Sequence, residues 1–190
     1  MNHLLIISHP RKTSLNHSIL QTAVEGLQKG GHNVEVRDLY EIGFQPLLGA
    51  NMADLLGIND EKVIQEQEYL IWADVVTFIY PIWWTGMPAM MKGYIERVFS
   101  YEFAYKYENG IQLGLLKGKK AVIINTQGKS LREYEASGMQ EALRLTSDKG
   151  IFEYCGFEVL SHIFFDSVDT ADQATREKWL KKIADIASKA

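Results

Sequence analysis

The sequence predicts a doubly wound α/β domain, in which helices cover both faces of a parallel sheet of five strands. Short apolar runs typical of buried parallel strands alternate with segments of helical periodicity along all 190 residues. This β-α alternation, repeated with right-handed crossovers, produces a parallel sheet. We expect the strands to lie in the order 2-1-3-4-5, within one domain over residues 1–190, and ligands to bind at their carboxyl ends.

Each predicted element has its own sequence signal. The first strand is an unbroken apolar run that ends in Ser-His-Pro, and the third, the most apolar, is ended by Pro81. The strands are expected over residues 3–8, 33–39, 75–80, 119–126 and 156–165. Helical spacing runs from Ile19 to Leu27 and stops at Gly30. Further helices are expected over 61–73, 88–99, 138–154 and 170–189, and a loop with a weak helical part over 43–57.

Composition narrows the function classes. With 20 basic and 24 acidic residues the net charge is -4, so nucleic acid is not an expected partner. We find no apolar segment of the roughly 20 residues that a membrane span needs, so no membrane insertion is expected. Cys155 is the single cysteine, which excludes an internal disulfide and fits a cytoplasmic protein. Scattered histidines give no metal-ligand pattern, so we expect no metal.

The first loop, residues 8–18, contains hydroxyls, an amide and two cations, Arg11 and Lys12, immediately before a helix. A helix N-terminus presents free N–H groups and a partial positive charge, which suits a phosphate. The loop has no glycine, so a dinucleotide fingerprint is absent. The alternative is that Ser14 and Asn16 only cap the helix. His9 is expected either to contact a ligand or simply to end the strand.

The second loop, residues 80–88, carries Trp83 and Trp84 in succession. Adjacent side chains of an extended segment point in opposite directions, so we expect one ring to pack inward and the other to border a flat ligand. Gly86 would allow close approach of the backbone to that ligand. The alternative is that Trp84 packs on a neighbouring helix.

Two other patterns resemble known catalytic or phosphate-binding motifs but lack a residue that the motif requires. Gly128-Lys129-Ser130 resembles the end of a phosphate-binding P-loop, but Ile123 stands where that motif requires glycine. A thiol phosphatase would need an arginine soon after Cys155, where Ser161 stands instead. We therefore expect Cys155 to be a buried structural residue.

A longer match is found from Tyr80 to Phe99, which reads Tyr-Pro-Ile-Trp-Trp-Thr-Gly-Met-Pro-Ala-Met-Met-Lys-Gly-Tyr-Ile-Glu-Arg-Val-Phe, with Glu-Phe-Ala-Tyr-Lys-Tyr at 102–107. Together with His9-Pro10 and residues 13–16 and 152–160, it resembles the NAD(P)H:quinone oxidoreductase family of flavodoxin-like flavoproteins. The general stress protein and modulator of drug activity branches share this signature. The resemblance covers nearly the whole chain.

The resemblance implies that one loop holds the flavin phosphate and two others lie along the flavin ring. The implied cofactor-binding residues are His9, Thr13, Ser14, Leu15, Asn16, Pro81, Ile82, Trp83, Trp84, Thr85, Asn125, Thr126, Gln127, Gly128 and Tyr134. Gln127 replaces the first glycine of the family's third loop, which makes close backbone approach there less favourable.

Tyr134, Tyr105 and Tyr107 are implied as catalytic residues. Tyr105 and Tyr107 match tyrosines that line the substrate site from the partner subunit, which implies a homodimer with shared active sites. Alternatively, Phe103, Tyr105 and Tyr107 form one face of an edge hairpin. Tyr134 matches a tyrosine that stabilises charge on the reduced flavin. The histidine of that relay falls at Gln140, so the relay is incomplete or another group serves, with His162 a remote candidate.

The resemblance thus implies a flavin-dependent NAD(P)H oxidoreductase that reduces quinones or similar flat acceptors by two successive hydride transfers. FMN is favoured over FAD because the chain is short between Pro46 and Glu61. Either NADH or NADPH fits as the donor. Two rivals belong to other classes. A flavodoxin electron carrier would be more acidic, and a redox-sensing regulatory subunit of a membrane transporter would need a partner surface.

Overall fold

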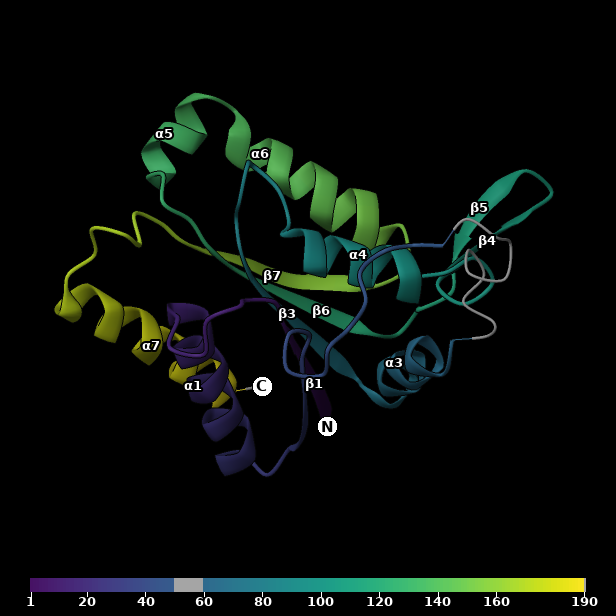
Figure 1. Ribbon diagram of the computed structural model, residues 1–190, viewed down its shortest axis with the longest axis horizontal. Helices are drawn as coiled ribbons and strands as arrows, with labels where there is room; N and C mark the ends of the chain where they lie inside the picture. The colour runs from purple at the N-terminus through teal and green to yellow at the C-terminus, as the bar shows by residue number, and fades with distance from the viewer. Residues whose placement is uncertain (50–59, 190) are drawn as a thin grey trace.

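The structure, a computed structural model, describes residues 1–49 and 60–189. Five parallel strands form its central sheet in the order β2-β1-β3-β6-β7, which confirms the predicted order (Figure 1). The strands are β1 (Asn2–Ile7), β2 (Asn33–Asp38), β3 (Val75–Pro81), β6 (Lys120–Thr126) and β7 (Glu158–Phe165). Of the loop with a weak helical part predicted over 43–57, residues 50–57 lie outside the described residues.

Helices cover both faces of the sheet (Figure 1). Successive side chains of a strand point to opposite faces, so Leu4 and Ile6 contribute to one core and Leu5 and Ile7 to the other. The face of Leu5 is covered by α1 (Leu15–Lys29) and α7 (Gln173–Ala187). The other face is covered by α3 (Glu61–Trp72), α4 (Ala89–Val98), α6 (Met139–Arg144) and the π-helix η1 (Leu145–Glu153).

Close packing of α1 against α7 depends on one glycine. A Cβ at Gly26 would lie 2.7 Å from the Cβ of Ala187, closer than two carbon atoms can approach. The two helices therefore meet through small residues near their C-terminal ends.

The region after β6 differs from the prediction. We expected a long loop and one helix over 138–154, but α5 (Leu131–Ala136) forms within that loop, and the later helix continues into η1. The missed signal is a capping box, in which Ser130 accepts from the N–H of Glu133 and the Glu133 side chain accepts from Ser130. The π-helix buries Ser147 and Asp148, which bear on the site below.

A hairpin lies apart from the sheet, at the right of Figure 1. It consists of β4 (Tyr105–Glu108) and β5 (Ile111–Gly114), paired antiparallel in a sheet of their own. The hairpin alternative is thus confirmed for Tyr105 and Tyr107, which lie on β4, whereas Phe103 precedes the hairpin.

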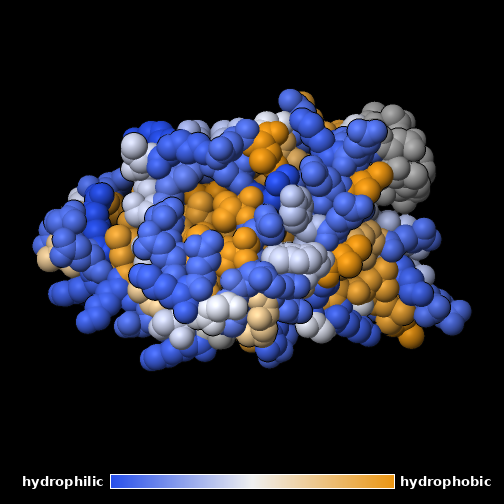
Figure 2. Space-filling view, turned by 90° about the horizontal axis from the view of Figure 1, so that it is seen from below, coloured by the Kyte–Doolittle hydropathy of each residue, from blue (hydrophilic) through white to orange (hydrophobic). Residues whose placement is uncertain are grey.

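Apolar side chains also reach the surface. Figure 2 shows them gathered in areas bordered by polar ones on the face seen from below. Exposed apolar area alone therefore does not mark the functional site. Within residues 1–49 and 60–189, no helix combines the length and apolar character that a membrane crossing requires.

Candidate active site

A cavity of about 730 Å³ opens at the carboxyl ends of the strands, where the loops after β1, β3, β6 and β7 meet. Three of these loops were the ones singled out from the sequence. Of the predicted cofactor-binding residues, those that line the cavity are His9, Thr13, Ser14, Leu15, Asn16, Pro81, Ile82, Trp83, Trp84, Thr126, Gln127 and Gly128. The predicted positions thus converge, although they are more than a hundred residues apart in sequence.

The N-terminus of α1 forms one wall of this cavity. Ser14 is its N-cap, and its hydroxyl accepts from the N–H of His17 at 3.3 Å, so the capping interpretation is confirmed for Ser14 and wrong for Asn16, which lies within the helix. The N–H groups of Leu15 and Asn16, the first two of the helix, have no intrahelical acceptor and carry partial positive charge. Capping and anion binding are therefore compatible here, because both use the same helix end.

Asn16 ties this wall to the third loop. Its side chain is buried, and Nδ2 donates to Oγ1 of Thr126 at 3.0 Å. Its Oδ1 has no hydrogen-bond partner in the described structure, and neither does Oε1 of Gln127, which also lines the cavity. Unpartnered buried acceptors are costly, and two of them beside one cavity indicate a ligand that carries hydrogen-bond donors.

The two cations of the first loop, Arg11 and Lys12, lie in different surroundings. Arg11 lines the cavity, whereas the Lys12 ammonium contacts Asp38 at 2.8 Å and also pairs with Glu41. Burial would raise the pKa of Asp38, but hydrogen bonds from Lys12 and His17 outweigh it and lower that pKa. Lys12 is thus held at the end of β2 by acidic groups, and the idea that both cations face a phosphate is wrong for Lys12.

His9 is buried beside Trp83, with 5.8 Å between the ring centroids. Nδ1 of His9 accepts from the N–H of Arg11 at 3.1 Å. Burial lowers the pKa of His9, so the ring is neutral at neutral pH. With Nδ1 acting as an acceptor, the single ring proton lies on Nε2, which makes His9 a hydrogen-bond donor.

The tryptophan loop turns tightly. Trp83 and Gly86 exchange two backbone hydrogen bonds of 3.1 Å, and the residues between them, Trp84 and Thr85, have φ values of 50° and 56°. These values belong to a type I′ turn, which normally uses asparagine and glycine. Residues without that freedom store strain there, a feature concentrated at functional sites.

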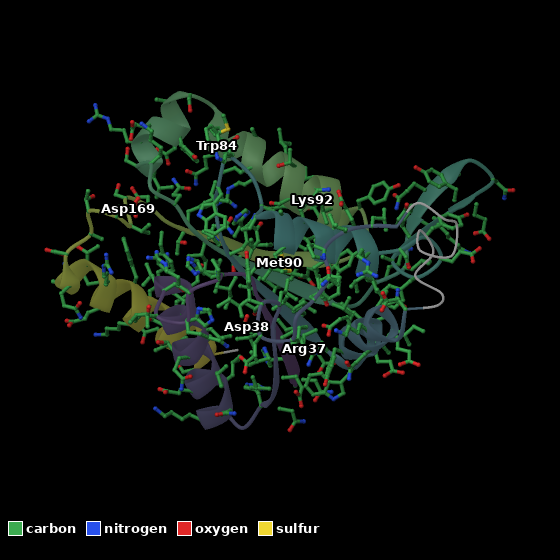
Figure 3. The ribbon with its side chains drawn as sticks, viewed as in Figure 1. Arg37, Asp38, Trp84, Met90, Lys92 and Asp169 are labelled. Atoms are coloured by element: carbon green, nitrogen blue, oxygen red, sulfur yellow. The ribbon has the colours of Figure 1, made fainter. Side chains whose placement is uncertain are left out.

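Neither tryptophan is part of the core. Trp83 is 43% exposed and Trp84 is 101% exposed, so the expectation that one ring packs inward is wrong. The alternative that Trp84 packs on a neighbouring helix is also wrong. Figure 3 labels Trp84 and Asp169 at the same end of the sheet, and both line the cavity. The strained turn holds a large aromatic ring at the cavity mouth without burying it.

The loop after β7 and the first turn of α7 add residues that the sequence did not point to: Val168 and Asp169 of the loop and Arg176 of the helix also line the cavity. Arg176 donates to the carbonyl oxygens of Val168 and Ala171 at 3.0 and 3.2 Å, which keeps its guanidinium beside the loop. A Cβ at Gly128 would lie 2.9 Å from Oδ2 of Asp169, so the loops after β6 and β7 approach each other closely. The sequence signal that could have found these residues is the end of the fifth predicted strand at 165, because the loop that follows it reaches the same edge of the sheet.

A second cavity of about 350 Å³ lies behind the tryptophan loop and shares only Ile82 with the first. Thr85 and Asn125, predicted to bind the cofactor, line this second cavity instead. Nδ2 of Asn125 donates to the carbonyl oxygen of Tyr80 at 3.1 Å, which turns the side chain away from the first cavity. His162, the remote candidate, lines the second cavity as well.

The three predicted catalytic tyrosines line neither cavity. Tyr134 lies on α5, half-buried against the core, and Gln140 on α6 has an unpartnered, buried Oε1. Tyr105 and Tyr107 lie on the hairpin, where the Tyr107 hydroxyl is 3.0 Å from that of Tyr154. Within one chain, the hairpin tyrosines and the first cavity are therefore separate.

Cys155 is buried, and burial raises the pKa of its thiol to about 12. A thiol with that pKa is protonated and unreactive at neutral pH, so the structural interpretation of Cys155 is confirmed.

Comparison with known proteins supports the same architecture. A family described as having a flavodoxin-like fold matches residues 1–187. An uncharacterized NAD(P)H oxidoreductase from Haemophilus influenzae is 37% identical over 187 residues, covering 97% of this chain and 93% of that protein. NAD(P)H dehydrogenase [quinone] 1 from Rattus norvegicus is 30% identical over 209 residues, covering 96% and 76%.

Solved structures are similar over the whole chain. The structure of Smu.1420 from Streptococcus mutans UA159 has a TM-score of 0.89 at 33% identity and covers 100% of both chains. NAD(P)H:quinone oxidoreductase from Methanothermobacter marburgensis has a TM-score of 0.88 at 28% identity, covering 99% of this chain and 98% of that one.

Proposed function

Because the chain belongs to the family with the flavodoxin-like fold, we propose that it is a flavin-dependent NAD(P)H oxidoreductase that reduces quinones or related flat acceptors. Relatives named for NAD(P)H oxidation and quinone reduction match nearly all of it. The observation that carries the proposal is the first cavity, which gathers a helix N-terminus, unpartnered buried acceptors and exposed tryptophans at the carboxyl edge of the sheet.

The residues of this cavity fit a flavin. Its volume of about 730 Å³ lies within the range of small-molecule sites. The α1 N-terminus, with Arg11 and Arg176 nearby, suits the phosphate. Oδ1 of Asn16 and Oε1 of Gln127 are free to accept hydrogen bonds, which the N3–H of a flavin ring and the hydroxyls of its ribityl chain offer. We favour FMN over FAD because these features provide one phosphate-binding helix end within one cavity.

The bound flavin would supply the hydride chemistry, accepting from NAD(P)H and delivering to the acceptor. The protein's contribution is binding, orientation and charge stabilisation. His9 donates from Nε2, and the helix N–H groups and Arg11 offset negative charge. Trp84 offers a flat, apolar face at the cavity mouth, against which an aromatic acceptor is held in stacking contact.

We further propose that two chains form a homodimer and that the cytoplasm is its compartment. The exposed Tyr107 and its neighbour Tyr105 lie away from the cavity of their own chain, which leaves them free to line a partner's site. The single, buried Cys155 is consistent with a reducing compartment. The redox-sensing subunit is not favoured, since the quinone reductase relatives match the whole chain.

An absorbance spectrum of the purified protein tests this function. Flavin bands should bleach when NADH or NADPH is added under argon and return when menadione follows, and mass analysis of the released cofactor identifies FMN or FAD. A protein that binds neither flavin and oxidises neither nucleotide would contradict the proposal. A protein that binds flavin but reduces no acceptor would instead favour the redox-sensing subunit.

A further inference from the structure

A chain of short polar contacts runs through the interior beside the second cavity. Nε2 of His162 lies 2.6 Å from Oδ1 of Asn125, and Nδ1 lies 2.7 Å from Oδ1 of Asp148. The Ser147 hydroxyl lies 2.6 Å from the same Asp148 oxygen and 2.8 Å from the carbonyl oxygen of Leu143. All four side chains are more than nine-tenths buried.

The orientation of Asn125 decides what His162 faces. Nδ2 of Asn125 donates to the Tyr80 carbonyl oxygen at 3.1 Å. Turning the amide over would bring its oxygen against that carbonyl oxygen, so Oδ1 must point to His162. Both ring nitrogens of His162 therefore face oxygen acceptors.

An ionised Asp148 and a neutral His162 together have too few protons to make hydrogen bonds at all of these contacts. The chain has four contacts, each of which needs one proton between its two heavy atoms. An ionised Asp148 and a neutral His162 supply only two, one from the Ser147 hydroxyl and one from the ring. Two of the four contacts would then lack a proton. One of them belongs to the Ser147 hydroxyl, whose single proton is shared between Asp148 and the Leu143 carbonyl oxygen. The other brings a ring nitrogen of His162 lone pair to lone pair with an oxygen at 2.6 or 2.7 Å, which is repulsive in a buried site.

We propose that Asp148 and His162 together hold one additional proton at neutral pH, and that this buried proton makes them positioning residues for the loop Asn125–Gly128. With it, both ring nitrogens donate, one to Asp148 and one to Asn125. The pair then carries no net charge whether the proton lies on the ring or on the carboxyl group.

The surrounding groups act on this proton in both directions. The pKa of His162 is lowered by burial, while the Asp148 carboxylate acts in the opposite direction. Arg144 on α6 lies 3.7 Å from Oδ2 of Asp148 and donates to the His162 carbonyl oxygen. From β3, Tyr80 is kept neutral because burial raises its pKa, and Lys92 of α4 lines the same cavity.

The proton would act on the first cavity through the backbone. Asn125 is followed by Thr126, whose carbonyl oxygen accepts from the N–H of Ile82 at 2.7 Å and whose hydroxyl accepts from Asn16. Loss of the proton removes one of the two side-chain hydrogen bonds of Asn125, the one with His162, and loosens the loop to which both other loops are attached. This effect on flavin binding rests on the proposed function, whereas the proton itself does not.

The proton is tested directly by NMR on the flavin-free protein at pH 7. We expect either two protonated ring nitrogens on His162 or a protonated carboxyl carbon shift for Asp148, with His162→Gln used to assign the signals. A neutral His162 beside an ionised Asp148 would overturn the proposal. This readout needs neither flavin nor turnover.

The role of the proton is tested with Asp148→Asn. An asparagine amide can donate to Nδ1 of a neutral His162, so all contacts can form without the additional proton. We expect FMN affinity of the native protein to fall about tenfold between pH 7 and 9, the effect of one lost buried hydrogen bond, and to stay flat in Asp148→Asn. Glu141→Gln, which removes an exposed carboxylate from α6, should titrate like the native protein.

The outcomes distinguish a failure of the positioning role from a failure of the proposed function. Equal pH dependence in the native protein and Asp148→Asn would overturn the positioning role. If no form binds FMN at any pH, the proposed function fails, and the NMR result still decides whether the pair holds the proton.

Discussion

The two ends of the central sheet are both hollowed, but in different ways. At the amino end, a groove of about 380 Å³ is lined mainly by apolar side chains of β3, β6, β7, α1 and α7. At the carboxyl end, the first cavity is lined by loops, by the N-terminus of α1 and by buried polar groups such as Asn16. At the amino end, the sides of strands and helices border the groove. At the carboxyl end, the loops and the N-terminus of α1 converge on the cavity.

The comparison shows that hollow space alone does not indicate a site. The amino end also buries an unpartnered polar atom, Nε2 of His3, but that ring packs against His32, with 4.8 Å between the ring centroids, beside a mainly apolar groove. The carboxyl end has Oδ1 of Asn16 and Oε1 of Gln127 beside a helix N-terminus and a strained turn. Function is expected where several costly features coincide, since each is tolerated only if a ligand or a reaction uses it.

The largest expected effect comes from Asn16→Leu at the carboxyl end. The substitution removes the free acceptor Oδ1 and leaves the Thr126 hydroxyl without its donor. Losing two polar interactions should weaken FMN binding about a hundredfold, or about 2.7 kcal/mol. Titration of the apoprotein with FMN, followed by fluorescence, measures this change.

Thr77→Val serves as the control at the amino end, because Thr77 is buried and lines the groove there. Its FMN affinity should stay within about twofold of the native value. If both substitutions weakened FMN binding equally, the difference between the ends would be one of stability and not of ligand binding.

Acid should destabilise the folded protein through His3 at the amino end of the sheet. Burial lowers the pKa of His3 to about 4 from its usual 6.5. The unfolded chain then binds more protons, so stability is fully present above pH 6.5 and is lost as the pH falls toward 4. Between pH 7 and pH 5 the loss should be about 1.5 kcal/mol, less than the roughly 2 kcal/mol that the full shift gives over this range, because solvent partly screens the site. Urea unfolding at pH 7 and pH 5, compared between the native protein and His3→Gln, measures it.

A His3→Gln protein that loses as much stability between pH 7 and pH 5 as the native one would show that another group is responsible. FMN affinity should not follow this acid effect, because His3 lies at the end of the sheet opposite the first cavity.

Most of the fold could be predicted from the sequence because buried parallel strands and amphipathic helices have periodic patterns. The convergence of residues 9–16, 81–84 and 126–128 followed from the topology, since loops after parallel strands meet at one edge. The shift of Asn125 to the second cavity could not be predicted, because a hydrogen bond to Tyr80 decides it. The binding of Lys12 by Asp38 likewise depends on pairs distant in sequence.

The exposed aromatic residue at the carboxyl end should matter for turnover and not for stability. Trp84 is fully exposed, so Trp84→Ala should change the free energy of unfolding by less than about 0.5 kcal/mol. Loss of its stacking face should lower kcat/KM for menadione about tenfold. Ile186→Ala removes an exposed apolar side chain from the amino end and should leave kcat/KM unchanged. Equal kinetics in both variants would remove Trp84 from the acceptor site.

The smallest expected effect compares two turns. Thr85 at the carboxyl end has φ 56°, and Gly118 before β6 at the amino end has φ 83° with no atom within 4 Å of a Cβ placed there. Gly118→Ala should therefore destabilise by about 1 kcal/mol from backbone strain alone. Thr85→Gly should stabilise by about 0.5 kcal/mol, since relief of strain is offset by the loss of the Thr85 hydrogen bond to the Trp84 carbonyl oxygen and by a more flexible unfolded chain. Urea midpoints measure both, and a destabilised Thr85→Gly would mean that the tryptophan turn is unstrained.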